Sequence, residues 1–309
     1  MEPRVDGLAG WMYNGWMTEP RRLAISFSGG ETSGYMAQWI FANWKDRYDE
    51  MRVTFANTGQ ENEETLEFVR QCDEFFGLGV VWVEAVVHPG ERRGSTHRVV
   101  DFATASRNGE PFEAVIAKYG IPNQAFPGAC TRELKLNAMR SYLDSIGWPR
   151  NSYDTAIGIR ADEMERGAEA SAKMAHLVFP LKSEHPMTKP QINAYWAAMP
   201  FRLNLKGYQG NCKWCWKKSL PKHLTIMSEH PEFYDFPERM EREYGMVGAR
   251  AARLGVPQVF FRKERSVIDL RALCAAGGWK PATDDAVEYP DEDDLPAGCS
   301  ESCEVSEGA

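Results

Sequence analysis

The sequence has no run of about 18 consecutive apolar residues, so no membrane span is expected. Its first residues lack a basic segment followed by an apolar core of about 7–15 residues, and we therefore expect no secretory signal. The cysteines number seven, an odd count in a chain of 309 residues, which disfavours a disulfide framework and favours a reducing compartment. These absences together predict a cytoplasmic protein.

Positive charge is missing from the C-terminal stretch. From Asp284 to the last residue there are ten acidic side chains and no Lys or Arg. Without these ten charges the formal net charge changes from −8 to +2. Few large apolar side chains and a high net charge predict a disordered acidic tail over 284–309. The near-neutral remainder neither requires nor excludes a nucleic-acid partner.

The chain upstream of this tail alternates apolar runs with amphipathic stretches. Strands are predicted at 22–27, 52–59, 80–87 and 153–163. Helices are predicted at 34–44, 62–77 and 130–147, and near 188–198, 219–229 and 232–254. This alternation predicts an α/β fold, with an open, mainly parallel sheet and helices on both faces.

Four segments follow from this pattern. We expect an N-terminal arm at 1–20, an α/β domain at 21–218, a helical extension at 219–283 and the acidic tail at 284–309. Within the α/β domain, residues 88–128 are rich in Gly, Pro, Arg and Asn and are interpreted as an insertion over the site, with one helix near 111–119.

The turn after the first predicted strand lacks two familiar phosphate-binding patterns, the Gly-Lys-Ser/Thr of a Walker-type loop and G-x-G-x-x-G. It reads Ser28-Gly29-Gly30-Glu31-Thr32-Ser33 instead. Two glycines let the backbone approach a ligand closely, and a positive φ is expected at Gly30. The helix start that follows favours negative charge. The hydroxyls of Ser28, Thr32 and Ser33 add donors. An anion site is predicted; the alternative is a plain strand–helix turn with a serine cap.

Basic side chains accompany this turn. Arg132 and Lys135 lie about one turn apart on the helix that begins at Cys130. Arg160 follows the fourth predicted strand at its carboxyl end, where open α/β sheets bind ligands. They are predicted to clamp phosphate or sulfate oxygens. The alternative for each is a solvated surface charge.

Six segments share a pattern with a known family. They are LAISFSGGETSGYM (23–36), FANTGQENEET (55–65), CTRELKLNAMRSYL (130–143), AIGIRADEMERG (156–167), VFPLKSEHPMTKPQINAYW (178–196) and FRLNLKGYQGNCKWCWKKS (201–219). In this order they resemble the phosphoadenosine-phosphosulfate (PAPS) reductase-like branch of the PP-loop superfamily, whose fold is the Rossmann-type adenine nucleotide α-hydrolase fold. The final segment resembles one found in bacterial and phage members.

This resemblance implies an ATP-using enzyme that adenylates a substrate and transfers sulfur to it. The loop at 28–33 would hold the phosphates with Mg²⁺, and Asn57 and Thr58 would lie near the adenosine. The sulfur acceptor would be a nucleic acid or a small molecule, and a cysteine desulfurase would donate the sulfur. The cell would be a bacterium or the host of a phage.

Cys130, Cys212 and Cys215 form the second implied group. The resemblance implies that these three thiolates hold a [4Fe–4S] cluster and leave one iron open for sulfide. A structural zinc site and unligated thiols are the alternatives. Nearby, Trp214 and Trp216 alternate with lysines, which suits stacking on single-stranded bases or, alternatively, a place in the core.

Two departures from the family pattern leave other functions open. Glu31 and Thr32 stand where the loop usually has Asp, and the C-terminal E-C-G-[LI]-H motif of true PAPS reductases is missing. The first rival is nevertheless a sulfonucleotide reductase. The second is an adenine-nucleotide-binding protein without turnover.

Overall fold

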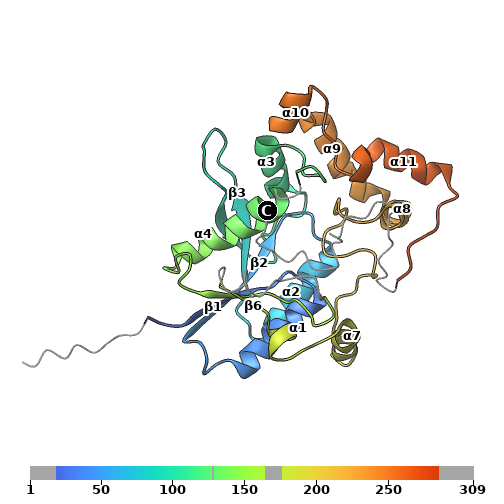
Figure 1. The fold of residues 1–309 in the computed structure, drawn as a ribbon. Helices are drawn as coiled ribbons and strands as arrows, with labels where there is room; N and C mark the ends of the chain where they lie inside the picture. The colour runs from blue at the N-terminus through green and yellow to red at the C-terminus, as the bar shows by residue number, and fades with distance from the viewer. Residues whose placement is uncertain (1–18, 127–128, 164–175, 285–309) are drawn as a thin grey trace, which may run out of the picture.

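A six-stranded sheet forms the centre of the protein (Figure 1). The computed structural model describes residues 19–126, 129–163 and 176–284. The strand order is β4-β3-β2-β1-β5-β6, and every neighbouring pair is parallel except β3 with β4. The strands are β1 (Arg22–Ser26), β2 (Glu50–Asn57), β3 (Val81–Val86), β4 (Thr96–Val100), β5 (Asp154–Ala156) and β6 (Leu177–Val178).

Alternate residues of the strands face two separate hydrophobic cores. In β2, Val53 and Phe55 join one core and Ala56 joins the other. In β1, Ile25 joins the first core, whereas Ala24 packs with Leu143 and Trp148 in a small third cluster. Because successive side chains of a strand point to opposite faces, these apolar runs require cover on both sides of the sheet.

Helices supply that cover. The first core contains side chains of α1 (Glu31–Asn43), α2 (Glu63–Phe76), α6 (Pro180–Ser183) and α7 (Lys189–Ala197). More helical elements contribute to the second core. They are α3 (Glu110–Tyr119), the π-helix Cys130–Leu136, α4 (Asn137–Ser145), α8 (Leu220–Glu229), the 3-10 turn Pro231–Tyr234, α9 (Asp235–Tyr244) and α11 (Val267–Ala276). The predicted α/β class, with a mainly parallel sheet covered on both faces, is confirmed.

The C-terminal helices pack on this same second core. Met240 of α9 and Leu270 of α11 lie in one cluster with Val83 of the sheet. In Figure 1 α9, α10 (Ala249–Leu254) and α11 lie together, coloured orange to red. The residues predicted as an extension thus share their core with the α/β body.

Several predicted elements differ in extent. The helix predicted from 34 begins at Glu31. The helix predicted at 232–254 is divided into the 3-10 turn Pro231–Tyr234, α9 and α10: α9 ends at Tyr244, and Gly248, with a φ of +97°, lies directly before α10. The strand predicted at 153–163 is only three residues long. Strand β4 and helix α11 were not predicted, because an edge strand and a helix at the chain's outer layer show weak apolar periodicity. Residues 1–18 and 285–309 of the predicted arm and tail lie outside the described residues.

The direction of the chain across the sheet reverses beside β1. After β1 the chain adds β2 and β3 on one side, and later β5 and β6 on the other side. Open α/β sheets bind ligands at such a switch point, outside the carboxyl ends of the strands. The loops after β1 and β5 lie there.

Candidate anion-binding site

The loop between β1 and α1 is shaped by its own serines. The Ser28 N–H donates to Ser33 Oγ at 3.1 Å, and the two hydroxyl oxygens are 2.9 Å apart. Ser33 Oγ also donates to the Gly30 carbonyl at 3.0 Å. These bonds hold the turn against the first residues of α1, and the positive dipole end of a helix favours an anion.

The two glycines of the loop have different tasks. Gly29 has a φ of +84°, and a Cβ there would lie 2.6 Å from Thr65 Cγ2. Gly30 has a φ of −96°, so our prediction that Gly30 takes the positive φ is wrong. A Cβ on Gly30 would stand 3.7 Å from Ser28 Oγ and from the amide of Asn211, in ordinary contact. Gly29 is required by the fold, whereas Gly30 faces the pocket.

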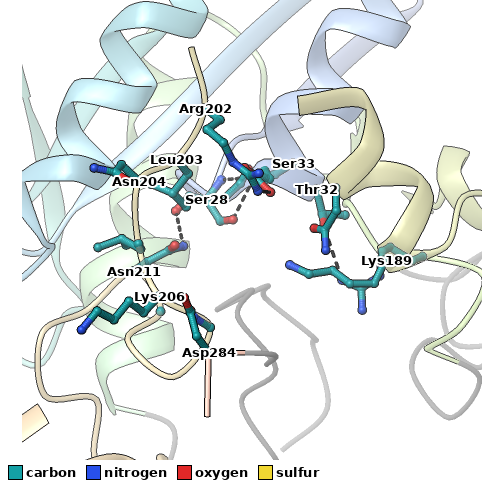
Figure 2. Close-up of a pocket in the computed structure, with 17 residues that line it drawn as sticks. Ser28, Thr32, Ser33, Lys189, Arg202, Leu203, Asn204, Lys206, Asn211 and Asp284 are labelled. Carbon is teal, nitrogen blue, oxygen red and sulfur yellow. Dashed lines mark hydrogen bonds and ion pairs between the residues drawn. The ribbon is translucent and has the colours of Figure 1, made fainter. Parts of the chain in front are cut away.

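A pocket of about 400 Å³ opens beside this loop (Figure 2). Ser28, Gly30, Thr32 and Ser33 line it from the loop and α1. Arg160 lines it from the chain beyond β5, and Lys189 from the start of α7. A long irregular segment, 202–211, and Asp284 complete the wall. The pocket therefore lies at the switch point of the sheet.

Cations dominate the pocket's charge. Arg160, Lys189, Arg202 and Lys206 line it, against two acidic side chains among the described lining residues, Glu31 and Asp284. The N-terminus of α1 adds a partial positive charge to that of the four cations. Such a set neutralises several negative charges at once, as a polyphosphate or a sulfate ester requires.

Carboxylates orient two of these cations. Buried Glu31 pairs with Arg202, with a nitrogen–oxygen distance of 3.1 Å. Arg160 Nε donates to Asp162 Oδ1 at 2.9 Å, and its Nη1 donates to Thr32 Oγ1 at 3.3 Å. These contacts hold the Arg160 guanidinium between the β5 loop and the start of α1.

Neighbouring groups stabilise the charged forms of Asp162 and Lys206. Burial alone raises the pKa of Asp162, but the Lys189 N–H and the Arg160 guanidinium outweigh it, and the pKa stays below its ordinary value. The Tyr208 hydroxyl and the Glu229 carboxylate raise the pKa of Lys206. Both lysine and carboxylate are therefore charged at neutral pH.

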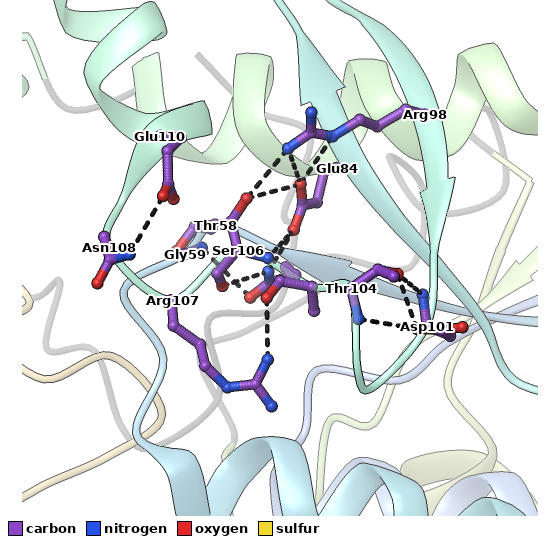
Figure 3. Close-up of polar contacts among 12 residues, drawn as sticks. Thr58, Gly59, Glu84, Arg98, Asp101, Thr104, Ser106, Arg107, Asn108 and Glu110 are labelled. Carbon is purple, nitrogen blue, oxygen red and sulfur yellow. Dashed lines mark hydrogen bonds and ion pairs between the residues drawn. The ribbon is translucent and has the colours of Figure 1, made fainter.

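Asn57 and Thr58, predicted near the adenosine, are engaged elsewhere; Figure 3 draws the polar contacts around Thr58, Glu84 and Arg98. Asn57 Nδ2 donates to Glu84 Oε1 at 2.6 Å, and Thr58 Oγ1 donates to Glu61 Oε1 at 2.8 Å. Glu84 is fully buried and pairs with Arg98. The structure places both predicted residues at the carboxyl end of β2, as expected, but inside a buried polar network and not among the residues that line the pocket.

Arg132 and Lys135 also lie apart from the pocket lining. Both belong to the π-helix Cys130–Leu136, which packs against β2 and β3. Arg132 Nε pairs with Glu133 at 2.9 Å, and Glu133 accepts a further bond from the Ser95 N–H. Of the three basic residues predicted to act on the substrate, the structure brings only Arg160 to the Ser28–Ser33 loop.

The predicted cysteine ligands occupy two segments. Cys130 begins the π-helix, and Cys212 and Cys215 lie in the loop before α8. Cys212 Sγ donates to Glu61 Oε1 across 3.9 Å. Within the three described ranges, no group of three or more Cys, His, Asp or Glu side chains that could hold a metal is found. In the described part of the chain the three predicted cysteines are thus not gathered into one ligand group.

Carboxylates for Mg²⁺ are likewise engaged. Both oxygens of Asp162 accept hydrogen bonds, from Arg160 and from the Lys189 N–H, and Glu163 accepts from the Arg160 N–H. The structure thus ties these two carboxylates to Arg160 and to the start of α7.

The segment around Asn211 joins three predicted motifs. Its Nδ2 donates to the Ser28 carbonyl at 2.8 Å, and its carbonyl accepts from the Asn62 N–H at 2.9 Å. Gln60 accepts from the Lys213 N–H and from the indole of Trp214. The loop 208–218 therefore holds the turn after β1 and the turn after β2 side by side.

Trp214 and Trp216 belong to the second core. Trp214 is 2% exposed and stacks on Phe112, with ring centroids 5.3 Å apart. Trp216 is 5% exposed. The alternative that placed a tryptophan in the core therefore applies to both, and neither indole is available to stack on a base.

Sequence reasoning missed several residues of the pocket. Lys189, Arg202, Lys206 and Asn211 lie in two of the segments that carried the family resemblance, but no local pattern marked them as ligands. One sequence signal could have marked them: residues 201–211 contain Arg, Lys and Asn and show no apolar periodicity.

Comparison with known proteins finds similarity to a phage protein. No protein-family profile matches the chain. The chain is 29% identical over 290 residues to the "uncharacterized nin region protein ORF290" of Escherichia phage lambda. The aligned region covers 92% of this chain and 95% of that protein. No helix in the described part of the chain is long and apolar enough to cross a membrane.

Proposed function

We propose that the chain is an adenine-nucleotide enzyme of the PP-loop type, similar to the PAPS reductase branch, and that it adenylates a substrate. The observation that carries this proposal is the meeting of the Ser28–Ser33 loop with Arg160 at the switch point of the sheet, in one cation-lined pocket. The six motif segments that resemble the family support the nucleotide as the ligand.

The proposed reaction uses positioning and charge neutralisation. A substrate oxygen attacks the α-phosphate of ATP, the bond from the α-phosphorus to the bridging oxygen breaks, and pyrophosphate leaves. The α1 N-terminus and the Ser28 and Ser33 hydroxyls would bind the leaving phosphates. Arg160 and Arg202 would neutralise the charge that develops there.

Sulfur transfer would be a second step, in which a sulfur nucleophile displaces AMP from the adenylate. We derive no role for an iron–sulfur cluster in it, because the three cysteines do not form a ligand group in the described structure. The cluster remains a prediction that metal analysis can test. After strictly anaerobic purification, iron that is lost equally in Cys130→Ala and Cys212→Ala would support one shared centre, whereas zinc would support a structural site.

Binding measurements test the first step. We expect ATP to bind the purified protein, and Arg160→Ala to weaken it by about 10-fold or more, the loss of about 1.4 kcal/mol or more of charge-assisted bonding. Arg253→Ala is the matched control, because Arg253 is exposed on α10, outside the pocket lining. Equal ATP affinity in all three proteins would contradict the assignment of the pocket.

Products separate the proposal from its two rivals. Pyrophosphate released from ATP in the presence of a substrate supports adenylation. Sulfite formed from an adenylyl-sulfate with a thiol reductant would identify a sulfonucleotide reductase instead. Nucleotide binding without any product would identify a binding protein that does not turn over.

A further inference from the structure

Asp284 brings the start of the acidic C-terminal segment to the pocket. Its Oδ1 accepts a hydrogen bond from the Gly207 N–H at 2.7 Å, and Asp284 lines the same pocket as Lys206 (Figure 2). Gly207 follows Lys206 in the irregular segment that carries two of the four pocket cations. A carboxylate of the chain itself is therefore part of the wall of the proposed nucleotide site.

The sequence beyond Asp284 continues this negative charge. Nine acidic residues and no Lys or Arg lie between 285 and 309. Consecutive Cα atoms are about 3.8 Å apart, so the Cα of Asp285 lies next to that of Asp284 whatever path the chain takes afterwards. At about 0.1 M salt the Debye length is about 10 Å, so the charge of Asp285 is not fully screened from the pocket wall.

We infer that the cation-lined pocket is also the docking site of the chain's own acidic segment, 284–309, which competes there with the anionic ligand. The inference rests on the proposed function only for the identity of that ligand. Charge complementarity carries it: Arg160, Lys189, Arg202 and Lys206 face a segment that begins inside their pocket and carries only negative charge. Because the segment is tethered, its effective concentration at the pocket is about millimolar.

A full-length variant with a neutral tail tests the competition. In it all nine acidic residues from 285 to 309 become Asn or Gln, and Asp284 is kept. We expect inorganic pyrophosphate to bind this variant about 10-fold more tightly than the natural chain at 20 mM NaCl, and the difference to shrink to about 2-fold or less at 500 mM. Equal affinity at low salt would overturn the inference.

A labelled synthetic peptide of residues 284–309 tests the docking surface directly. We expect it to bind the neutral-tail protein, and pyrophosphate to displace it. Lys206→Ala in the neutral-tail protein should weaken peptide binding, and Arg253→Ala should not, because Arg253 lies outside the pocket lining. Peptide binding that survives saturating pyrophosphate, or that depends on Arg253 and not on Lys206, would overturn the inference.

The two proposals fail in different ways. If ATP binds the natural and neutral-tail chains equally at low salt, the nucleotide site stands and the docking inference fails. If neither chain binds ATP but pyrophosphate still displaces the peptide, the docking inference stands and the nucleotide function fails.

Discussion

The side-chain amide of Asn211 donates a hydrogen bond of 2.8 Å to the main-chain carbonyl of Ser28, 183 positions earlier in the sequence. This bond joins the 202–211 wall of the pocket to the Ser28–Ser33 loop. It also leaves Asn211 Oδ1 and Nδ2 near the space in front of Gly30, where a Cβ would lie 3.7 Å from both.

Asn211→Ala should therefore loosen the pocket without unfolding the protein. The main-chain bonds of residue 211 to Asn62 remain, and only the side-chain bond to Ser28 is lost. The loss of one such bond costs about 1 kcal/mol, which corresponds to about 5-fold weaker pyrophosphate binding in titration calorimetry. Asn108→Ala, at an exposed site outside the pocket lining, is the control and should bind normally. An unchanged affinity in Asn211→Ala would show that the bond does not shape the site.

The two loop glycines should separate folding from binding. Gly29→Ala places a side chain at a φ of +84° and against Thr65, so we expect a loss of about 1–3 kcal/mol in the free energy of unfolding. Gly30→Val leaves an extended φ of −96° that Val tolerates, and its side chain enters the pocket. Urea unfolding should detect the first effect and pyrophosphate titration the second. The reverse pattern would contradict the geometry of the loop.

The position of the Ser28–Ser33 loop between a strand and a helix could be predicted because its sequence signals are local. Ser28, Thr32, Ser33 and the glycines are neighbours in the chain, and the strand before them and the helix after them have clear apolar patterns. Arg160 was found for a related reason, since the carboxyl end of a parallel strand fixes the edge at which the next residues emerge.

The other predicted site residues do not line the pocket, because tertiary structure decides their partners. Asn57 was placed correctly at the end of β2, but buried Glu84 on the neighbouring strand captures its amide, and sequence spacing does not reveal this pairing. Lys189, Arg202 and Lys206 converge only after the segment that follows α7 folds across the switch point. No local periodicity encodes that convergence.

Glu31 offers a test of the pocket's electrostatics. Its buried carboxylate neutralises Arg202 at 3.1 Å and repels an incoming anion. Glu31→Gln should therefore strengthen pyrophosphate binding by about 5-fold at low salt, with a smaller effect at high salt. Glu184→Gln is the matched control, because Glu184 pairs with Arg47 and lies outside the pocket lining. Weaker binding in Glu31→Gln would instead show that Glu31 is needed to aim Arg202.

Glu241 links α9 to the chain that leads into α11. Its two carboxylate oxygens accept the Phe260 N–H at 2.9 Å and the Val267 N–H at 2.8 Å. Burial raises the pKa of Glu241, and the two hydrogen bonds only partly offset this effect. The resulting pKa is about 7, against an ordinary value of 4.5. The folded protein thus holds a proton on Glu241 at pH values where the unfolded chain has released it.

The stability that this carboxyl contributes should be lost as the pH rises. Between pH 4.5 and 7 the folded state binds the extra proton, so the free energy of unfolding falls through that window, by about 3 kcal/mol at most. Glu241→Gln cannot titrate, so its stability relative to the natural protein should rise by a similar amount from pH 5 to pH 8. Urea unfolding of both proteins at several pH values measures this difference and cancels the titration of every other group. A difference that stays constant with pH would mean that Glu241 is already ionised in the folded protein at pH 5.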